Sequence, residues 1–404
     1  MPLVPWRQED GGPRRTQTTP GRLDAAGSTL AVTTRVAPVC TMPFGDDEGL
    51  YLLRHSAGEG ATSFVERIDP TSLEPEARSP ELTGGPVWPG GAAVHDNGSL
   101  HVVFGNHAHR LDRDLHVVAT TELPRARPYN SFVTLPDGHL VTKDFGGSLP
   151  TQQLRPDERQ PCELVVLEPD GMAIVDRLEL AEPSIARLSA DGDDVYVVGD
   201  TRLSRVRWNG TRLAVDDDFR AVYRTIDGQT YGWDCVLAAG HAWFLDDGEG
   251  SERFNGTLRG NGVSTAPLHL ARVDLATGAV ALAEVCGRPG GLIANPPVVD
   301  ERRGVAAGYD SGNGVMTAFA LDDLSVLWRR EQDHASHLLL YEDSGELVTG
   351  DHADVVVLDI ATGAELARAD TGSGIQSVLF PTPGYERDFY VCSLLAVSRV
   401  VVGG

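Results

Sequence analysis

The chain has 404 residues, with 34 basic against 58 acidic side chains and a formal net charge of −24. Such an acidic chain is a poor match for nucleic acid or for an anionic membrane surface, and we expect neither as a partner. No signal peptide opens the sequence and no apolar run reaches membrane-spanning length, so we expect a cytoplasmic protein. The oligomeric state stays open.

The cysteines do not form a recognisable framework. There are five, Cys40, Cys162, Cys235, Cys286 and Cys392, with no CxxC pair and an odd one left over. Four of them lie in apolar runs, which predicts buried free thiols in a reducing compartment.

The N-terminus differs in composition from the rest of the chain. Residues 1–28 are polar, with Pro, Gly and Arg and no periodicity, which predicts a flexible arm. Residues 29–404 are then expected to form a single domain. That domain opens with Thr29–Val36, which reads as a strand without a neighbouring partner.

A hydrophobic run that closes on a turn recurs from residue 65 onward. The seven copies are VERIDPTSLEP at Val65, HRLDRDLHVV at His109, ELVVLEPDGMAIV at Glu163, LSRVRWNGTRLAV at Leu203, LARVDLATGAVAL at Leu270, MTAFALDDLSVLW at Met316 and VVVLDIATGAEL at Val355. From Asp69 to Asp359 there are 290 residues over six intervals, about 48 per repeat. Four short strands of this total length cannot bury both faces alone, so the period predicts the stacked blades of a β-propeller.

The number of blades follows from the two ends of the chain. Residues 374–402 offer three further strands and no fourth. Pairing them with Thr29–Val36 would close the ring and remove both exposed edges. The fold class is therefore all-β, a single propeller of eight four-stranded blades closed by the N-terminal strand, with seven blades as the alternative.

Polar residues recur where the chain enters the innermost strand of successive blades. Aligning the turns brings six positions into register: Asn130, Ser184, Trp233 with Asp234, Asn295, His337 and Gln376. These side chains would point into one channel, where apolar residues would pack at lower cost. We call this set the inner arc.

A second ring of polar residues ends the second strands: His55, Asn106 with His107, Asp144, Asp200, Asp246 with Asp247, Asp310, and Asp351 with His352. Asp and Asn at strand ends bond nearby backbone amides, which requires no ligand. A ligand-binding role for this ring is the other interpretation, and the sequence leaves both open.

Two long insertions separate the second and third strands of blades 3 and 5. They are residues 146–161 and 248–267, and both should emerge at the channel mouth above the inner arc. The second is rich in glycine, which predicts a mobile lid over a bound ligand.

Two resemblances bear on the chemistry. VVVLDIATGAEL resembles the blades of quinoprotein-like propellers, although the aromatic-rich quinone-binding pattern is absent and no quinone is expected. RPYNSFVTLPDGHLVTKD, residues 127–144, resembles the gluconolactonase and strictosidine-synthase-like propellers. The second resemblance implies a central metal ion held by Asn and Asp side chains of the inner strands.

These observations favour an enzyme that acts on a small polar molecule at the channel mouth, by metal-assisted hydrolysis (lactonase-like) or by a lyase or isomerase reaction. One divalent cation, calcium or a transition metal, would be held by Asn130, Asp234, Asn295 and His337. The expected catalytic residues are Asp234, His337 and His352, with either histidine as general base. The expected ligand contacts are Tyr129, Asn130, Trp233, Gln376 and Asp144.

The rival interpretation is a non-catalytic propeller that binds a ligand or a protein on its acidic face. No phosphate-binding or dinucleotide-binding glycine motif occurs in the sequence, so no nucleotide cofactor is expected.

Overall fold

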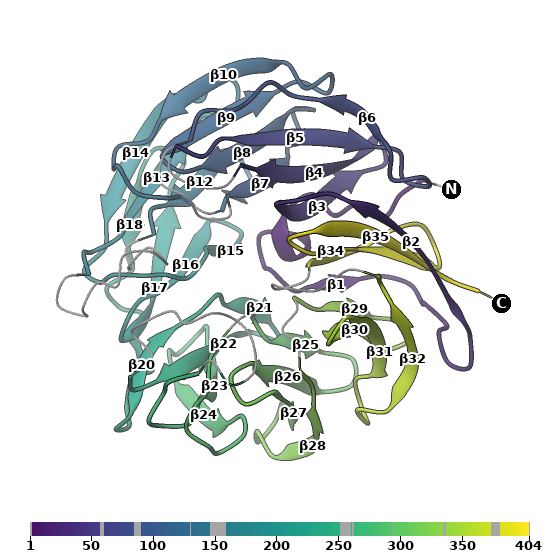
Figure 1. Cartoon of the computed structure of the whole chain (residues 1–404). Helices are drawn as coiled ribbons and strands as arrows, with labels where there is room; N and C mark the ends of the chain where they lie inside the picture. Colours follow the sequence, from purple (N-terminus) through teal and green to yellow (C-terminus); the bar gives the residue numbers. More distant parts are fainter. Residues whose placement is uncertain are drawn as a thin grey trace.

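Nearly every regular element is a β-strand, and the strands form a ring of eight sheets (Figure 1). This computed structural model describes residues 2–56, 60–84, 90–129, 131–145, 159–250, 260, 262–293, 295–333, 337–372 and 380–403. In that part of the chain no helix is long and apolar enough to cross a membrane.

Each sheet is one blade, and its strands pair antiparallel in order from the axis outward. Blade 1 is β3 (Cys40–Asp46), β4 (Gly49–His55), β5 (Ser63–Ile68) and β6 (Pro75–Arg78). Blade 2 is β7 (Gly91–Val94), β8 (Leu100–Phe104), β9 (His107–Leu111) and β10 (Val117–Glu122). Blade 3 is β11 (Val133–Thr134), β12 (Leu140–Lys143), β13 (Glu163–Leu167) and β14 (Ile174–Glu179). Blade 4 is β15 (Ser189–Asp191), β16 (Asp194–Val198), β17 (Arg202–Trp208) and β18 (Leu213–Val215), with β19 (Ala221–Val222) also on β17.

The second half of the ring repeats this order. Blade 5 has an interrupted innermost strand, β20 (Gln229–Gly232) and β21 (Val236–Ala238), followed by β22 (His241–Gly248), β23 (His269–Asp274) and β24 (Val280–Glu284). Blade 6 is β25 (Val298–Asp300), β26 (Val305–Asp310), β27 (Val315–Ala320) and β28 (Val326–Glu331). Blade 7 is β29 (Leu339–Tyr341), β30 (Glu346–Asp351), β31 (Asp354–Asp359) and β32 (Glu365–Asp370). The short strand β1 (Thr18–Thr19) pairs parallel with β29, and a single 3-10 turn, η1 (Glu9–Gly11), precedes it.

The turn that ends the third strand explains the repeated motif. The Asp69 carboxylate accepts hydrogen bonds from the Thr71 and Ser72 amides, and Asp274 does the same for Ala276 and Thr277. The Thr277 hydroxyl and the two amides hold the pKa of Asp274 below the usual range, and the amide and hydroxyl of Ser72 do the same for Asp69. The recurring acidic residue is therefore a turn cap.

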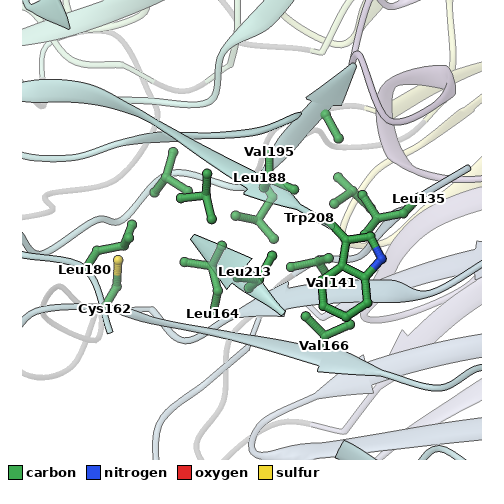
Figure 2. Close-up of a cluster of buried hydrophobic side chains, with 14 residues drawn as sticks. Leu135, Val141, Cys162, Leu164, Val166, Leu180, Leu188, Val195, Trp208 and Leu213 are labelled. Atoms are coloured by element: carbon green, nitrogen blue, oxygen red, sulfur yellow. The ribbon is translucent and has the colours of Figure 1, made fainter. Parts of the chain in front are cut away.

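Blades pack face to face through apolar side chains. The contact between blades 3 and 4 is built from both sheets (Figure 2): Leu135, Val141, Cys162, Leu164 and Val166 on one side, and Leu188, Val195, Trp208 and Leu213 on the other. Middle strands such as β8 are buried along their whole length. In outermost strands such as β28, exposed residues alternate with partly buried ones. This gradient is the one expected for sheets stacked around an axis.

The eighth blade closes the ring as the sequence predicts. It consists of β33 (Phe380–Pro383), β34 (Asp388–Cys392), β35 (Ala396–Val402) and the N-terminal strand β2 (Leu30–Val36). All seven residues of β2 pair with β35, from Leu30 opposite Val402 to Val36 opposite Ala396. The count of eight blades is confirmed, and the alternative of seven is excluded.

The closure should tolerate a charge on one side of β2 only. Val32 packs against the core between blades 7 and 8, whereas its neighbour Ala31 is exposed. Val32→Asp should lower the free energy of unfolding by about 2 kcal/mol or more, because the new carboxylate loses water. Ala31→Asp is the matched control and should cost less than about 0.5 kcal/mol. Equal losses in urea titrations of the two variants would contradict this account of the closure.

Candidate functional site at the ring axis

The N-terminal arm, residues 2–28, crosses the axis of the ring. Its backbone forms hydrogen bonds with the innermost strands of five blades, at Gly45, Val94, Ala190, Leu237 and Leu340. The partners in the arm are, in the same order, Trp6, Arg7, Pro13, Arg14 and Gln17. The segment that the sequence predicts to be flexible is therefore held to the blades by backbone hydrogen bonds. The division of the chain into an arm and a domain near residue 28 stays a prediction.

The arm lies at one end of the axis. We call this end the base; it carries the turns between first and second strands, and the opposite end, where the chain enters the innermost strands, is the mouth. At the base, the Gly21 amide donates to the Asp343 carboxylate at 3.0 Å. Glu346, the first residue of β30, accepts the amides of Leu23 at 2.9 Å and Ala25 at 2.6 Å. These contacts attach the arm to the base and direct residues 8–17 towards the axis.

Six titratable side chains meet where the arm reaches the axis, and we call them the axial cluster: Glu9, Asp10 and Arg15 from the arm, and Arg187, Asp234 and His337 from the blades. The fully buried Arg15 is the centre of the cluster. Its guanidinium contacts Asp10, lies 3.3 Å from Glu9 Oε2 and lies 3.6 Å from Asp234 Oδ2.

Arg187 provides the second positive charge of the cluster. Its Nε lies 3.0 Å from Glu9 Oε2 and its Nη1 lies 3.2 Å from Asp234 Oδ2. The Arg187 amide also donates to Asp234 Oδ1 at 2.6 Å. Asp234 stands in the break between β20 and β21, and this break in blade 5 presents its carboxylate to both arginines.

His337 joins the cluster through the arm. Its Nδ1 lies 2.6 Å from Asp10 Oδ1, and its ring stacks on Phe380 of blade 8 at 4.3 Å between centroids. The neighbouring amide of Leu338 donates to Gln17 Oε1 at 2.7 Å. The arm thus fixes both the ring and the backbone of His337.

The two acids of the arm respond differently to burial. Burial raises the pKa of Glu9 to about 7, and the opposing attraction of Arg187 and Arg15 does not cancel it. Burial also acts against ionisation of Asp10, but His337 and Arg15 outweigh it and hold the pKa of Asp10 well below its usual range. Glu9 and Asp10 therefore bring to the cluster one carboxylate that is firmly ionised and one carboxyl group that titrates near neutrality.

Several buried polar atoms near the axis have no hydrogen-bond partner within the described chain. They are Glu9 Oε1, Arg15 Nε, Ser131 Oγ and Asn295 Oδ1. A Cβ placed on Gly91 would lie 2.6 Å from Ser131 Cα and 2.8 Å from Glu9 Oε1, so the glycine allows the Glu9 carboxylate to approach blade 3. Buried polar groups usually have partners, and unsatisfied ones indicate room for water or a ligand.

The structure brings together part of the inner arc. Asp234 and His337 both reach the axial cluster, and Asn295 is fully buried with its Nδ2 donating to Pro296 O at 3.1 Å. Asn130 and Gln376 lie outside the described residues, as do residues 146–158, 251–259 and 261 of the two insertions. The lid hypothesis therefore stays a prediction.

The other expected site residues lie apart from the cluster contacts. Tyr129 is buried beside Asp144, and burial raises the pKa of its phenol above the usual range. Trp233 is half-buried and bonds Leu245 through its amide. His352 is an exposed residue of the β30–β31 turn and contacts Asp333 and Asp351. Their functional roles stay predictions.

Four members of the acidic ring at the second-strand ends accept backbone amides. Backbone amides donate to Asp144 from Glu163 at 2.5 Å, to Asp246 from His269 at 2.6 Å, to Asp310 from Leu292 at 3.2 Å and to Asp351 from Asp333 at 3.0 Å. Asp144 also pairs with Arg127 at 3.0 Å. These bonds favour the backbone-capping interpretation of the ring.

Four members of the axial cluster were not expected from the sequence: Glu9, Asp10, Arg15 and Arg187. The arm segment EDGGPRR places an acid pair and an arginine pair around two glycines. That pairing was the available signal, but it has no period and resembles any solvated charged segment.

The cluster should depend on Arg15 far more than on an exposed arginine of the same arm. Arg15→Met leaves Glu9, Asp10 and Asp234 around the single guanidinium of Arg187, which should cost about 3–5 kcal/mol of unfolding free energy. Arg22→Met is the control, because Arg22 is exposed and pairs with the exposed Asp24. Chemical unfolding of both variants measures the difference, and similar losses would show that the arm is not held by the cluster.

Comparison with known proteins identifies an architecture. No protein-family model and no curated protein sequence matches the chain. Among solved structures, BamB from Moraxella catarrhalis is similar over 93% of this chain and 99% of its own, with 15% identity and a TM-score of 0.56. The quinohemoprotein alcohol dehydrogenase of Comamonas testosteroni is similar over 100% of this chain and 81% of its own, with 11% identity and a TM-score of 0.68. For quinohemoprotein alcohol dehydrogenase ADHIIG of Pseudomonas putida HK5 the coverages are 99% and 80%, the identity 9% and the TM-score 0.64. The likeness extends to the fold: the chain is an all-β, eight-bladed propeller similar to BamB and to the quinoprotein alcohol dehydrogenases.

Proposed function

We propose that the chain binds and processes a small polar molecule at the axis, on the mouth side of the arm. Glu9 is the observation that carries this proposal. Its Oε2 is held by Arg15 and Arg187, while its buried Oε1 has no partner among the described residues. A polar ligand that bonds Oε1 would satisfy this group, as water would in the free protein.

The surroundings of Glu9 suit a ligand with several oxygens. Ser131 Oγ and Asn295 Oδ1 are also buried and unpartnered, and they come from blades 3 and 6. Of the two, Ser131 adjoins Glu9, because a Cβ placed on Gly91 would touch both residues. A hydroxylated or carbonyl-bearing molecule could bond Glu9 Oε1 and Ser131 Oγ together.

The reaction class that this arrangement supports is proton transfer. A carboxyl group with a pKa of about 7 can give or take a proton at working pH, which is the property required of a general acid or base. Arg15 and Arg187 would stabilise negative charge that develops on a substrate oxygen. Hydrolysis of a lactone, or a lyase or isomerase step, uses these elements. The acid–base role assigned to His337 or His352 from the sequence passes to Glu9 in this proposal, since His337 is already bonded to Asp10.

A resident cation receives no support from the described residues. Among them, no group of three or more His, Cys, Asp or Glu side chains is arranged to hold a metal ion. Of the proposed ligands, Asp234 is occupied by two arginines and His337 by Asp10, so a cation would have to displace these pairs. The cation site therefore stays a sequence-based prediction.

A quinone, which the names of two structural neighbours suggest, does not fit the centre of this ring. Residues 8–17 of the arm bond the innermost strands directly, and the axial cluster takes up the space that a planar group would need. No step is assigned to such a group.

The second candidate is a propeller that binds its ligand without chemistry. It is favoured by the ion pairs that occupy Asp234 and His337, the two inner-arc residues expected to be catalytic. In both candidates the partner is a small molecule.

Hydrolysis of glucono-δ-lactone, followed by proton release at constant pH, separates the two candidates. If Glu9 transfers the proton, Glu9→Gln should reduce the rate at least about a hundredfold. Glu74→Gln, at an exposed turn, should leave the rate unchanged. The non-catalytic candidate is supported if the lactone is not hydrolysed but lactone or gluconate raises the melting temperature of the protein in a saturable way. Neither hydrolysis nor such a rise contradicts the lactone as substrate class.

The pKa of Glu9 also predicts a pH dependence of stability. Because its folded pKa is about 7 and its ordinary value 4.5, the folded chain retains a proton that the unfolded chain releases between these pH values. Its contribution to stability is full below pH 4.5 and is lost as the pH rises to 7. About 2.5 pKa units at about 1.4 kcal/mol each amount to roughly 3–4 kcal/mol. Glu9→Gln should remove this loss, so urea titrations of variant and wild type should diverge by that amount across the interval; parallel pH profiles would contradict the buried, protonated Glu9.

A further inference from the structure

The point where the ring closes is held by more than the pairing of β2 with β35. The short connection from β2 to β3 runs beside the β34–β35 turn of blade 8. There the Ala37 amide donates to Leu395 O at 2.9 Å, and the Val39 amide donates to Leu394 O at 2.6 Å. The backbone of blade 1 is therefore in direct contact with blade 8 one residue before β3 begins.

Two cysteines flank this contact. Cys40 is the first residue of β3, and Cys392 is the last residue of β34. Both are buried in the same apolar cluster between blades 1 and 8, which also contains Ala37, Tyr390 and Val397. Cys40 is close enough to be among the groups that raise the pKa of the Cys392 thiol.

The other cysteines have different surroundings. Cys162 belongs to the core between blades 3 and 4, and Cys235 to the core between blades 4 and 5. Cys286 is half-buried, and its Sγ lies 3.1 Å from Asp310 Oδ2. The pair at the closure is thus the one place in the described chain where two thiols meet.

We propose that Cys40 and Cys392 form a disulfide that locks the propeller ring, with a small-molecule disulfide as oxidant. The thiolate of one cysteine attacks the oxidant, forms a mixed disulfide and releases one thiolate. The thiolate of the other cysteine then attacks the protein sulfur of the mixed disulfide and releases the second thiolate. Two protein thiols lose two protons and two electrons, and one oxidant molecule is reduced to two thiols.

Burial determines when this reaction takes place. Burial and the neighbouring Cys40 hold the pKa of Cys392 far above its usual range, so its thiolate is scarce in the closed ring. We expect oxidation during folding, or when the β34–β35 turn opens, and slow reduction afterwards. The bond would join the first blade to the last and enclose nearly the whole chain in one covalent loop, which disfavours the open and unfolded states.

The test refolds the reduced full chain in oxidised glutathione, or in reduced glutathione as a reference. The products are unfolded in iodoacetamide and mapped by mass spectrometry. In oxidised glutathione we expect one Cys40–Cys392 linkage and alkylated Cys162, Cys235 and Cys286. The melting temperature should be several degrees above that of the reduced reference.

Single Ser variants provide the controls. Cys40→Ser and Cys392→Ser should each lose the linkage and the difference in melting temperature between the two redox conditions. Cys162→Ser and Cys235→Ser, at equally buried thiols, should keep both. The proposal is overturned if Cys40 and Cys392 of the wild-type chain are alkylated after refolding in oxidised glutathione, or if the linkage forms without raising the melting temperature. This measurement is independent of ligand binding at the axis.

Discussion

The guanidinium of Arg15 is the group on which the centre of this propeller depends. It is fully buried and contacts three carboxylates, two from its own arm and one from blade 5. Burying so many charges has a large desolvation cost, which is offset only when all partners are in place. The arm should therefore dock as one unit. Where it docks, it positions Glu9, the carboxyl group with the unusual pKa.

The arm also pairs with strand edges that an open propeller axis would leave exposed. The innermost strand of each blade is a sheet edge. Its amides and carbonyls that face the axis have no neighbouring strand in the blade to pair with. Five of these strands, β3, β7, β15, β21 and β29, form backbone hydrogen bonds with arm residues 6–17, mostly by donating their amides to carbonyls of the arm. The arm also contributes the apolar side chains of Trp6, Leu23 and Ala25 to the core shared by blades 7 and 8. The N-terminal arm thus both pairs with the edge strands and fills the axis.

Acidic residues serve two purposes in this fold, and their partners distinguish them. At second-strand ends, Asp144, Asp246, Asp310 and Asp351 accept backbone amides and hold local geometry. Asp200 is different: burial raises its pKa to about 6, against the attraction of Arg159. At the axis, Glu9 has one oxygen that its surroundings leave unsatisfied, a property that points to a ligand rather than to a turn.

The sequence alone determined the repeating unit, the eight blades and the pairing of β2 with the last blade, because turn caps such as Asp69 and Asp359 and the alternation of strands are local patterns. It also placed Asp234 and His337 at the innermost strands, since register within a repeat follows from the turns. Only the tertiary structure decided what these residues contact. Their partners Arg15 and Asp10 lie more than two hundred residues away in a segment without periodicity, and no local pattern encodes contacts between parts of the chain that are so distant in sequence.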